Sequence, residues 1–188
     1  MGRIRYGFSN LYYALATDDG NGTLTYATPV KIPGAKGMTM TPAGTDVSEP
    51  ADNVTWFNTS TNDGYTGSIE FEDTEEADAF LVAVLGMTKD ATSGLTVEKS
   101  SDDHREFAIL GQMQLAGGTE TGKRACFYRC TASRPEIAAQ TKEVGGLTVA
   151  TNTVNITALP RISDNTVKST AVSTDSVYAS FFTAVPEN

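Results

Sequence analysis

Along most of the chain, short runs of apolar and β-branched residues alternate with polar positions and end at turn residues. Runs of about four to eight residues with this pattern are typical of β-strands. Clusters of Gly, Asn, Asp and Pro separate them, as expected of connections between strands. The pattern therefore predicts a mainly β protein with mostly antiparallel strands. Strands are expected at residues 11–17, 23–32, 51–57, 64–71, 94–99, 105–115, 124–132, 152–159 and 176–185.

The sequence Asp-Asp-Gly-Asn-Gly at 18–22 joins the first two of these strands. Gly, Asn and Asp are the residues that tight hairpin turns favour, because they accept positive φ angles at low cost. A calcium-binding loop also combines acidic residues with Gly, but it needs later ligands and a closing glutamate, which this stretch lacks. We therefore interpret 18–22 as a turn.

One segment departs from the β pattern and predicts an α-helix at about 74–85. Its apolar residues recur at spacings of three and four, which places them on one face of a helix. We expect this face to seal the hydrophobic core against a β-sheet. The apolar positions are Ala77, Phe80, Leu81, Val84 and Leu85.

The ends of the predicted helix carry residues that usually begin and end helices. Asp73 is placed to cap the N-terminus, and Glu76 completes a pair like a capping box. Gly86 follows the last apolar residue, as glycines at helix C-termini do. Six acidic residues and no base lie from Glu70 to Asp78. We interpret them as a solvated face with favourable charge at the helix N-terminus, with a functional acidic patch as the alternative.

The pattern Gly, four residues, Gly, Lys at 117–123 has the spacing of a phosphate-binding loop. Such a loop requires Ser or Thr after the Lys, to hold magnesium, and a helix after the loop. Here Arg124 follows the Lys, and the next residues alternate as a strand does. We therefore interpret 116–123 as the loop of a hairpin between strands at 107–115 and 124–132.

Two cysteines, Cys126 and Cys130, lie within the second strand of this hairpin. On a regular strand Cys126, Tyr128 and Cys130 share one face, and Phe127 and Arg129 share the other. Four residues of strand separate the two thiols by about 13 Å, whereas a disulfide needs Cα atoms within about 7 Å. We expect two reduced, buried thiols.

Catalytic chemistry is not expected, because the sequence contains no recognisable catalytic motif. The only histidine, His104, lies in the polar stretch 100–106 and is predicted to be a solvated loop residue. A catalytic triad or a Cys–His pair would depend on it, and no nucleophile signature accompanies it. A zinc site would need more ligands than two cysteines. The sequence predicts no catalytic, cofactor-binding or metal site, and the chain is not expected to be an enzyme.

The bulk composition suits one folded domain spanning residues 1–188. With 14 Lys and Arg against 23 Asp and Glu, the net charge is −9, which does not favour binding to nucleic acid phosphates. No apolar run is long enough to cross a membrane, and no secretory signal opens the chain. Two loops, 41–52 and 133–146, are expected to be long, and long loops of this kind often contact other chains.

In order and spacing, these segments resemble the major tail protein family of long-tailed (siphovirus-type) bacteriophages, the tail tube proteins. The resemblance extends over nearly the whole chain and rests on the succession of pieces, none of which is a strict signature. After Pro160 only a final strand matches. The matching pieces are GFSNLYYALAT (7–17), YATPVKIPGAKGMTM (26–40), ADNVTWF (51–57), GYTGSIEFED with TEEADAFLVAVLG (64–86), FAILGQMQLAGGTETGKRACFYRCTASRPE (107–136) and VNITALP (154–160).

The resemblance implies a β-sandwich or half-barrel with one flanking helix, long loops and terminal arms. It also implies that the chain is a structural protein of the virion tail, assembled in the host cytoplasm. Six subunits would join their inner sheets into a continuous barrel, and rings would stack into a hollow tube that carries DNA to the host. The implied partners are other copies of the chain and further tail proteins, such as the tape measure and the tail terminator. DNA would pass through the lumen without specific binding, and no membrane would be involved.

Physical reasoning supports assembly, because open sheet edges are a liability in a monomer and closing the sheet in a ring removes them. An acidic lumen would also repel the DNA backbone. The alternative is a monomeric β-sandwich binding module, such as an adhesin or a carbohydrate-binding domain. That alternative needs an exposed aromatic face, for which Trp56, Phe57 and Tyr65 are the candidates. The ordinary interpretation of these three residues is that they pack in the core.

Overall fold

The structure is a computed structural model that describes residues 4–115, 118–137 and 150–187. It confirms a mainly β fold with one large antiparallel sheet and one flanking α-helix, and the described strands do not form a closed barrel. The large sheet contains β1 (Arg5–Asp18), β2 (Leu24–Tyr26), β3 (Val30–Ile32), β4 (Ala35–Ala43), β7 (Gly64–Glu72), β10 (Phe107–Leu115), β11 (Gly118–Ala132), β12 (Thr151–Leu159) and β13 (Lys168–Ala171). The remaining elements are the strand pairs β5 (Asp46–Ala51) with β6 (Val54–Ser60) and β8 (Thr88–Lys89) with β9 (Thr96–Val97), the helix α1 (Glu75–Leu85) and a 3-10 turn, η1 (Ser176–Tyr178).

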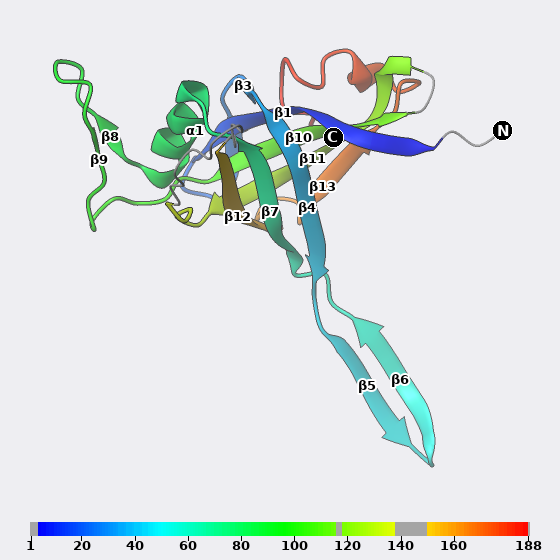
Figure 1. The fold of residues 1–188 in the computed structure, drawn as a ribbon. Coiled ribbons are helices and arrows are strands. Elements are labelled where there is room, and N and C mark those ends of the chain that lie inside the picture. The colour runs from blue at the N-terminus through cyan, green and yellow to red at the C-terminus, as the bar shows by residue number, and fades with distance from the viewer. Residues whose placement is uncertain (1–3, 116–117, 138–149, 188) are drawn as a thin grey trace, which may run out of the picture.

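The sheet curls because one stretch of chain pairs at both of its ends. Its strand order is β2-β1-β10-β11-β12-β7-β4, with β3 beside β1 and β13 beside β11. β3 and β4 are separated only by a tight turn, so the same stretch borders β1 and then β7 (Figure 1). Gly34 in this turn has φ 71°, and a Cβ atom there would lie 2.5 Å from the Cβ of Glu72, so the bend requires glycine.

The main core lies between the curled sheet and α1. Phe80 is fully buried at its centre, with ring centroids 5.0 Å from Tyr13, 5.8 Å from Phe71 and 5.7 Å from Phe107. Edge-to-face contacts of this kind add to the free energy gained by burying the rings. All five apolar helix positions predicted from the sequence are buried, so the predicted helix face is confirmed.

The N-terminal cap of the helix differs from the prediction by one residue. Thr74, not Asp73, is the N-cap, and its hydroxyl accepts a hydrogen bond from the Ala77 amide at 3.2 Å. Asp73 instead accepts a hydrogen bond from the Asn152 side chain at 2.9 Å, which ties the start of the helix to β12. Gly86 ends the helix with φ 73°, as predicted.

A β-bulge in β11 corrects the predicted faces of this strand. Phe107 pairs with Cys130 but Ile109 pairs with Phe127, so β11 has one residue more than β10 between these pairs. The extra residue reverses the alternation. Cys130 therefore joins Phe127 in the main core, whereas Cys126 lies with Tyr128 in a second core on the opposite face of the sheet. Both thiols are free and buried, as expected.

The second core is covered by the C-terminal segment, which the sequence analysis wrongly predicted to be a strand at 176–185. The segment forms η1 followed by turns, and the last strand is β13, which the analysis missed. Phe181 is buried beneath the segment, and Phe182 stacks on Tyr12 with centroids 4.7 Å apart. The guanidinium of Arg124 lies 3.7 Å from the centre of the Tyr178 ring. The sheet is therefore buried on both faces where β1, β10 and β11 lie.

Several predicted boundaries also change. The predicted strand 23–32 is two strands, β2 and β3, and the predicted strand 94–99 contributes only β9. The hairpin of β10 and β11 is confirmed, but β11 begins at Gly118, inside the predicted loop 116–123. The predicted loop 41–52 is largely strand. Of the predicted loop 133–146, residues 133–137 have no regular structure and the rest lies outside the described residues.

The first prediction concerns the seal between α1 and the sheet. We expect Leu81→Asp to abolish soluble folding, because Leu81 is 8% exposed and an unpaired carboxylate there costs a large part of a total stability of about 5–15 kcal/mol. Ala79→Asp, on the exposed side of the same helix, should leave a folded protein. Circular dichroism and thermal unfolding of both variants provide the test, and a well-folded Leu81→Asp protein would contradict the assignment.

A second prediction follows from an ion pair beside the second core. Arg161 lies over the Tyr128 ring at 4.4 Å and pairs with Asp164, and its hydrogen bonds lower the pKa of the Asp164 carboxyl to about 2. A lowered pKa stabilises the fold above the ordinary value near 3.8, and this contribution disappears as the pH falls through about 2. Asp164→Asn should therefore lower the denaturant midpoint at pH 7, and the difference from the parent protein should vanish near pH 2. If the denaturant midpoints of the variant and the parent protein differed equally at both pH values, the stabilising role of the ionised Asp164 carboxylate would be contradicted.

Candidate assembly surface

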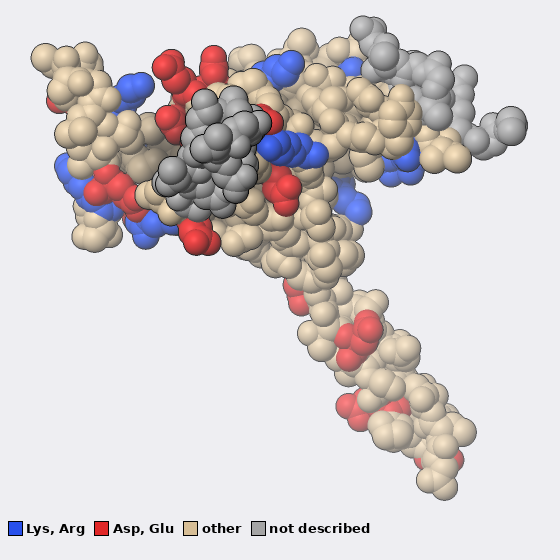
Figure 2. Space-filling model, viewed as in Figure 1, with Lys and Arg blue, Asp and Glu red and all other residues tan. Residues whose placement is uncertain are grey.

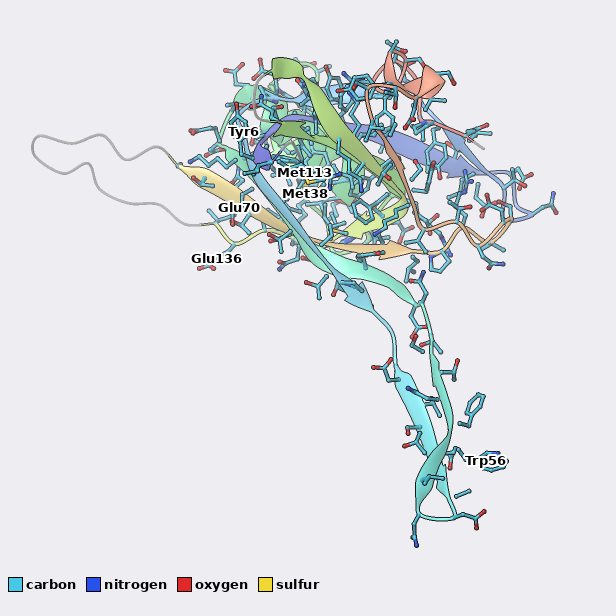
Figure 3. The ribbon with its side chains drawn as sticks, turned by 90° about the vertical axis from the view of Figure 1, so that its right-hand side faces the viewer. Tyr6, Met38, Trp56, Glu70, Met113 and Glu136 are labelled. Carbon is cyan, nitrogen blue, oxygen red and sulfur yellow. The ribbon has the colours of Figure 1, made fainter. Side chains whose placement is uncertain are left out.

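A two-stranded arm extends from the body of the protein (Figures 1 and 3). It consists of β5 and β6 and continues the direction of β4 and β7, with hydrogen bonds from Asp63 N to Ala43 O at 2.9 Å and from Thr61 N to Thr45 O at 3.0 Å. At its tip, Asp52 and Asn53 have φ angles of 50° and 63°. Two positive φ angles in a two-residue loop form the turn that fits the twist of a hairpin. The predicted strand 51–57 thus contains a tight turn as well as part of β6.

The pairing of the two strands gives the arm one apolar face. Residues directly opposite each other in an antiparallel pair share a face. Val47 lies opposite Thr59, Glu49 opposite Phe57, and Ala51 opposite Val54, and a bulge at Trp56 interrupts the alternation. The bulge brings Val54 and Phe57 onto the same face, although their sequence positions differ by the odd number three. The other face carries Asp46, Ser48, Pro50, Thr55, Asn58 and Ser60.

The apolar side chains of the arm have no cover within the described chain. Trp56 is 74% exposed and Phe57 is 52% exposed, and Figure 3 shows Trp56 pointing away from the ribbon. Every residue of β5 and β6 is exposed. A free two-stranded hairpin is at best marginally stable in water, and a cluster of exposed large apolar side chains marks an interaction site. The expectation that Trp56 and Phe57 pack in the core is therefore wrong.

The charge of the arm restricts the surfaces that it fits. Residues 44–63 contain Asp46, Glu49, Asp52 and Asp63 and no Lys or Arg, and the arm in Figure 2 carries acidic but no basic side chains. Opposite charges across an interface favour association, and like charges oppose it. The arm therefore fits a surface that is apolar or basic.

A second feature for assembly is the edge of the large sheet. β4 is the last strand in the order, and it pairs with β7 on one side. No strand of the described chain is paired along its other side, so a row of backbone N–H and C=O groups is left for another partner. Such an edge readily adds a strand from another chain.

The outward face of β12, β7 and β4 carries short, uncharged polar side chains. On the core side lie Ile69, Phe71, Val154 and Ile156, so their sequence neighbours point outward. Glu70, opposite Thr153, and Glu72, opposite Thr151, are carboxylates of this face, and Lys36 pairs with Glu72 at 3.2 Å. Directly paired rows cross the three strands as Thr39–Ser68–Asn155 and Thr41–Thr66–Thr157. These rows contain no basic or aromatic side chain.

The residues weighed for catalysis or metal binding do not converge. His104 is exposed, and its Nδ1 atom lies 2.8 Å from the carbonyl oxygen of Ala132. Burial raises the pKa of both cysteine thiols, which opposes the reactive thiolate form. Within the described residues, no group of three or more His, Cys, Asp and Glu is placed to hold a metal ion.

Within the same residues, no helix has the length and apolar character needed to cross a membrane.

Comparison with known proteins gives a weak structural likeness. No family model matches the chain, and no curated protein matches its sequence. A chain in the cryo-EM structure of the anti-feeding prophage (AFP) baseplate, 6-fold symmetrised, is similar in structure, with a TM-score of 0.49 and 11% identity. The match covers 91% of this chain and 96% of that chain. Neither the identity nor the TM-score is high enough to assign a family or a function.

Of the three aromatic residues considered for an exposed face, the structure brings two together. Trp56 and Phe57 lie on the arm, whereas Tyr65 lies on the body, half-buried against Phe127 with ring centroids 5.2 Å apart. Val47 and Val54, which complete the apolar face, were not singled out from the sequence. The signal for Val47 lies in residues 46–51, which the sequence analysis placed mainly in the predicted loop 41–52, whereas Val54 lies in the predicted strand 51–57.

We predict that the apolar face of the arm contributes little to the stability of the monomer. The double substitution Trp56→Ser with Phe57→Ser should change the free energy of unfolding by no more than about 0.5 kcal/mol, as for other exposed positions. Phe80→Ala, in the buried core, should cost about 3–5 kcal/mol. Denaturant unfolding at low protein concentration compares the two, and a large loss for the arm variant would show that the arm folds against its own body.

Proposed function

We propose that this chain is the subunit of a phage tail tube. In this proposal, copies assemble into hexameric rings that stack into a hollow tube for the passage of DNA to the host. The chain would act as a structural virion protein, with the tape measure and the tail terminator as further partners, and would not be an enzyme. The proposal unites the resemblance of the sequence to major tail proteins with the assembly features of the structure.

The single observation that carries the proposal is the arm. Its apolar face holds Val47, Val54 and Phe57 beside the bulged Trp56, and the described chain covers none of them. A protein that keeps such an element gains stability when another molecule covers it. Since the arm continues β4 and β7, a copy docked on it can extend the same sheet from subunit to subunit.

The free edge of β4 supports the ring. Edge-to-edge pairing of identical subunits buries the backbone groups that each monomer leaves open. If the rotation between neighbours closes after a whole number of copies, a ring forms without residual edges. The sixfold number is taken from the resemblance to tail tube proteins.

The outward face of β12, β7 and β4 suits the wall of a DNA channel. Phosphate groups are held by Lys, Arg and aromatic stacking, and the rows of Thr, Ser and Asn on this face offer none of these. Glu70 adds negative charge, which repels a polyanion. A wall of this kind lets DNA slide without being held.

Electron microscopy tests the proposal directly. We expect purified protein to associate as its concentration rises and to form rings or tubes with an open channel in negative stain. The average particle mass measured by light scattering should likewise increase with protein concentration. A protein that stays monomeric at the highest soluble concentration, without rings or tubes, would contradict the proposal.

The arm variant adds a sharper test of the same proposal. Trp56→Ser with Phe57→Ser should leave a folded monomer that no longer forms tubes. Thr55→Ser with Asn58→Ser changes two residues on the polar face of the same strand and should assemble like the parent protein. Unchanged assembly of the Trp56 and Phe57 variant would show that the arm is not the contact.

A second candidate function is favoured by the exposure of Trp56 and Phe57. Exposed aromatic rings also bind sugars in carbohydrate-binding domains, which suits the adhesin or carbohydrate-binding alternative. That function predicts a monomer that binds glycans through these two side chains. A glycan array with the parent and the double variant distinguishes the two functions, because a tube protein should give no signal that depends on Trp56.

A further inference from the structure

The segment 172–187 crosses the face of the sheet formed by β1, β10 and β11 without joining the sheet (Figure 1). It follows β13, the last strand. Within the described residues, its backbone–backbone hydrogen bonds all join residues of the segment itself, such as Tyr178 N to Asp175 O at 3.0 Å and Thr183 N to Ser180 O at 2.9 Å. The segment can therefore leave the sheet without breaking any pairing between strands.

The segment buries few apolar side chains against the sheet. Phe181 and Val185 are buried in the second core, and Phe182 stacks on Tyr12 at its border. Removing the segment exposes much less apolar surface than unfolding the whole body does. A local opening of this kind costs less free energy than global unfolding, because the hydrophobic contribution grows with the apolar area that is buried.

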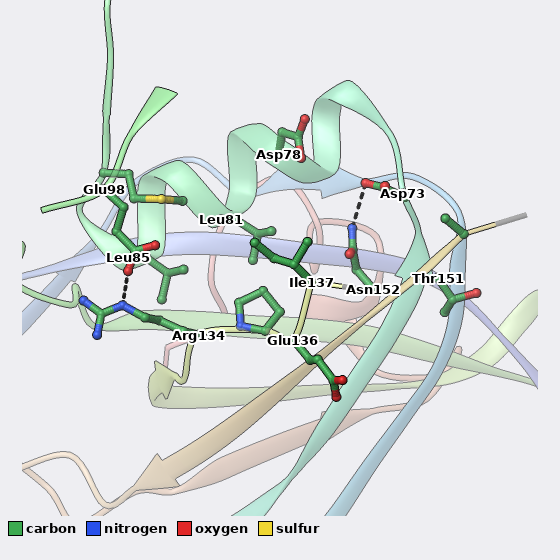
Figure 4. Close-up of a pocket in the computed structure, with 13 residues that line it drawn as sticks. Asp73, Asp78, Leu81, Leu85, Glu98, Arg134, Glu136, Ile137, Thr151 and Asn152 are labelled. Atoms are coloured by element: carbon green, nitrogen blue, oxygen red, sulfur yellow. Dashed lines mark hydrogen bonds and ion pairs between the residues drawn. The ribbon is translucent and has the colours of Figure 1, made fainter. Parts of the chain in front are cut away.

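The main core has a cover that is attached more firmly. The helix α1 buries five apolar side chains, and its start is tied to β12 by the hydrogen bond from Asn152 to Asp73 (Figure 4). Its end is tied to the chain before β10, because the Arg105 amide donates to the carbonyl oxygen of Val84 at 2.8 Å. The main core is therefore expected to stay closed when the segment 172–187 leaves the opposite face.

One side chain of the sheet holds much of the segment. The guanidinium of Arg124, on β11, lies 3.7 Å from the centre of the Tyr178 ring and 4.6 Å from the centre of the Phe182 ring. It also donates a hydrogen bond to the carbonyl oxygen of Tyr178. On the sheet side, its Nε donates to the buried Gln112 side chain at 3.0 Å, which fixes the position of the guanidinium. Cation–π contacts and hydrogen bonds to a charged group are strong when they are shielded from water.

Two further hydrogen bonds attach the segment near its two ends. The Gly122 amide donates to the Tyr178 hydroxyl at 2.8 Å, and the Tyr128 hydroxyl donates to the carbonyl oxygen of Pro186 at 2.7 Å. Both donors belong to β11, the strand that carries Arg124. The described polar attachment therefore depends on a single strand.

The two cysteines lie on opposite faces of this strand and report on the two cores separately. Cys126 shares the second core with Phe181 and Val185, whereas Cys130 lies in the main core. Both thiols are buried. Opening of the segment uncovers the face that holds Cys126 and leaves Cys130 covered by the main core.

We propose that residues 172–187 form a lid that opens and closes on a folded body, with Arg124 as its latch. In the open state the sheet, α1 and the main core remain intact, and the apolar side chains of the second core are exposed, among them Leu110 and Tyr128. The latch therefore sets how often a second apolar surface, separate from the arm, is exposed to other molecules. This inference does not depend on the proposed tail function.

Pulse alkylation of the unmodified protein tests the lid, because a buried thiol reacts only when the reagent reaches it. Trypsin cleaves after Arg124 and Arg129 and so places Cys126 and Cys130 on different peptides, which mass spectrometry quantifies separately. Under native conditions we expect Cys126 to react at least about tenfold faster than Cys130, since local opening exposes only Cys126. Equal rates at the two thiols, including no reaction at either, would overturn the lid.

A substitution at Arg124 tests the latch. Arg124→Gln should raise the alkylation rate of Cys126 by at least about tenfold, because the cation–π contacts and the charged hydrogen bond are lost, and should leave the rate of Cys130 unchanged. Lys123→Gln makes the same change of charge at the preceding residue of β11, whose side chain points to the other face, and should react as the parent protein does. An unchanged rate at Cys126 in Arg124→Gln, or equal acceleration at both thiols, would overturn the role of Arg124.

Hydrogen exchange measures the same opening without any substitution. The amides of Thr183 and Ala184, both bonded to the carbonyl oxygen of Ser180, should exchange at least about tenfold faster than the amides paired in β10. Their exchange should depend only weakly on denaturant, because lid opening exposes little surface. Exchange of these amides only together with β10, with the denaturant dependence of global unfolding, would show that the segment does not open on its own and would overturn the proposal.

Discussion

The structure depends on one constraint, which is that a two-stranded β-ribbon cannot bury its own apolar side chains. The body of the protein has two cores on the two faces of one sheet, and both are closed by elements of the same chain. Within the part of the chain that the structure describes, the arm of β5 and β6 has no such cover, although it carries Val54, Trp56 and Phe57. In the proposed assembly, another molecule completes this element.

Two strands of the body, β4 and β7, connect the arm and the free edge to the main core. β4 and β7 leave the sheet as the two strands that continue into the arm, and β7 leads on the other side into α1. Phe71, on β7, packs against Phe80 of the helix. The same strand therefore connects the main core with the base of the arm. The bulge in β11 shifts the alternation of this strand, so that Cys130 joins Phe127 in the main core while Cys126 and Tyr128 lie in the second core.

Much of the body could be predicted from the sequence because its signals are local. The spacing of Ala77, Phe80 and Val84 defined the buried helix face, and Gly86 marked its end. The remaining errors have causes that are not local. The bulge of β11 arises from pairing with β10, so Cys126 and Cys130 could not be assigned to opposite faces from their spacing. The segment with Phe181 and Phe182 alternates as a strand does, but it packs across the face of the sheet and pairs with no edge.

The candidate site was only partly accessible to sequence reasoning. Trp56 and Phe57 were recognised as candidates for an exposed aromatic face, but burial is the ordinary fate of such residues. Their exposure follows from the length of the β5–β6 ribbon beyond the sheet, which depends on where β4 and β7 stop pairing with the body. The latch of the lid combines Arg124 of β11 with Tyr178 and Phe182 of the C-terminal segment, and these are brought together only by the tertiary fold.

Trp56 is the only tryptophan of the chain, so fluorescence excited selectively at tryptophan reports on the arm alone. The central claim is that a second copy covers this side chain on assembly. Fluorescence spectra over a series of protein concentrations should show an emission maximum typical of exposed tryptophan at low concentration and a shift to shorter wavelength as the protein associates. Association that leaves the emission maximum unchanged would contradict the claim that the arm is the assembly surface.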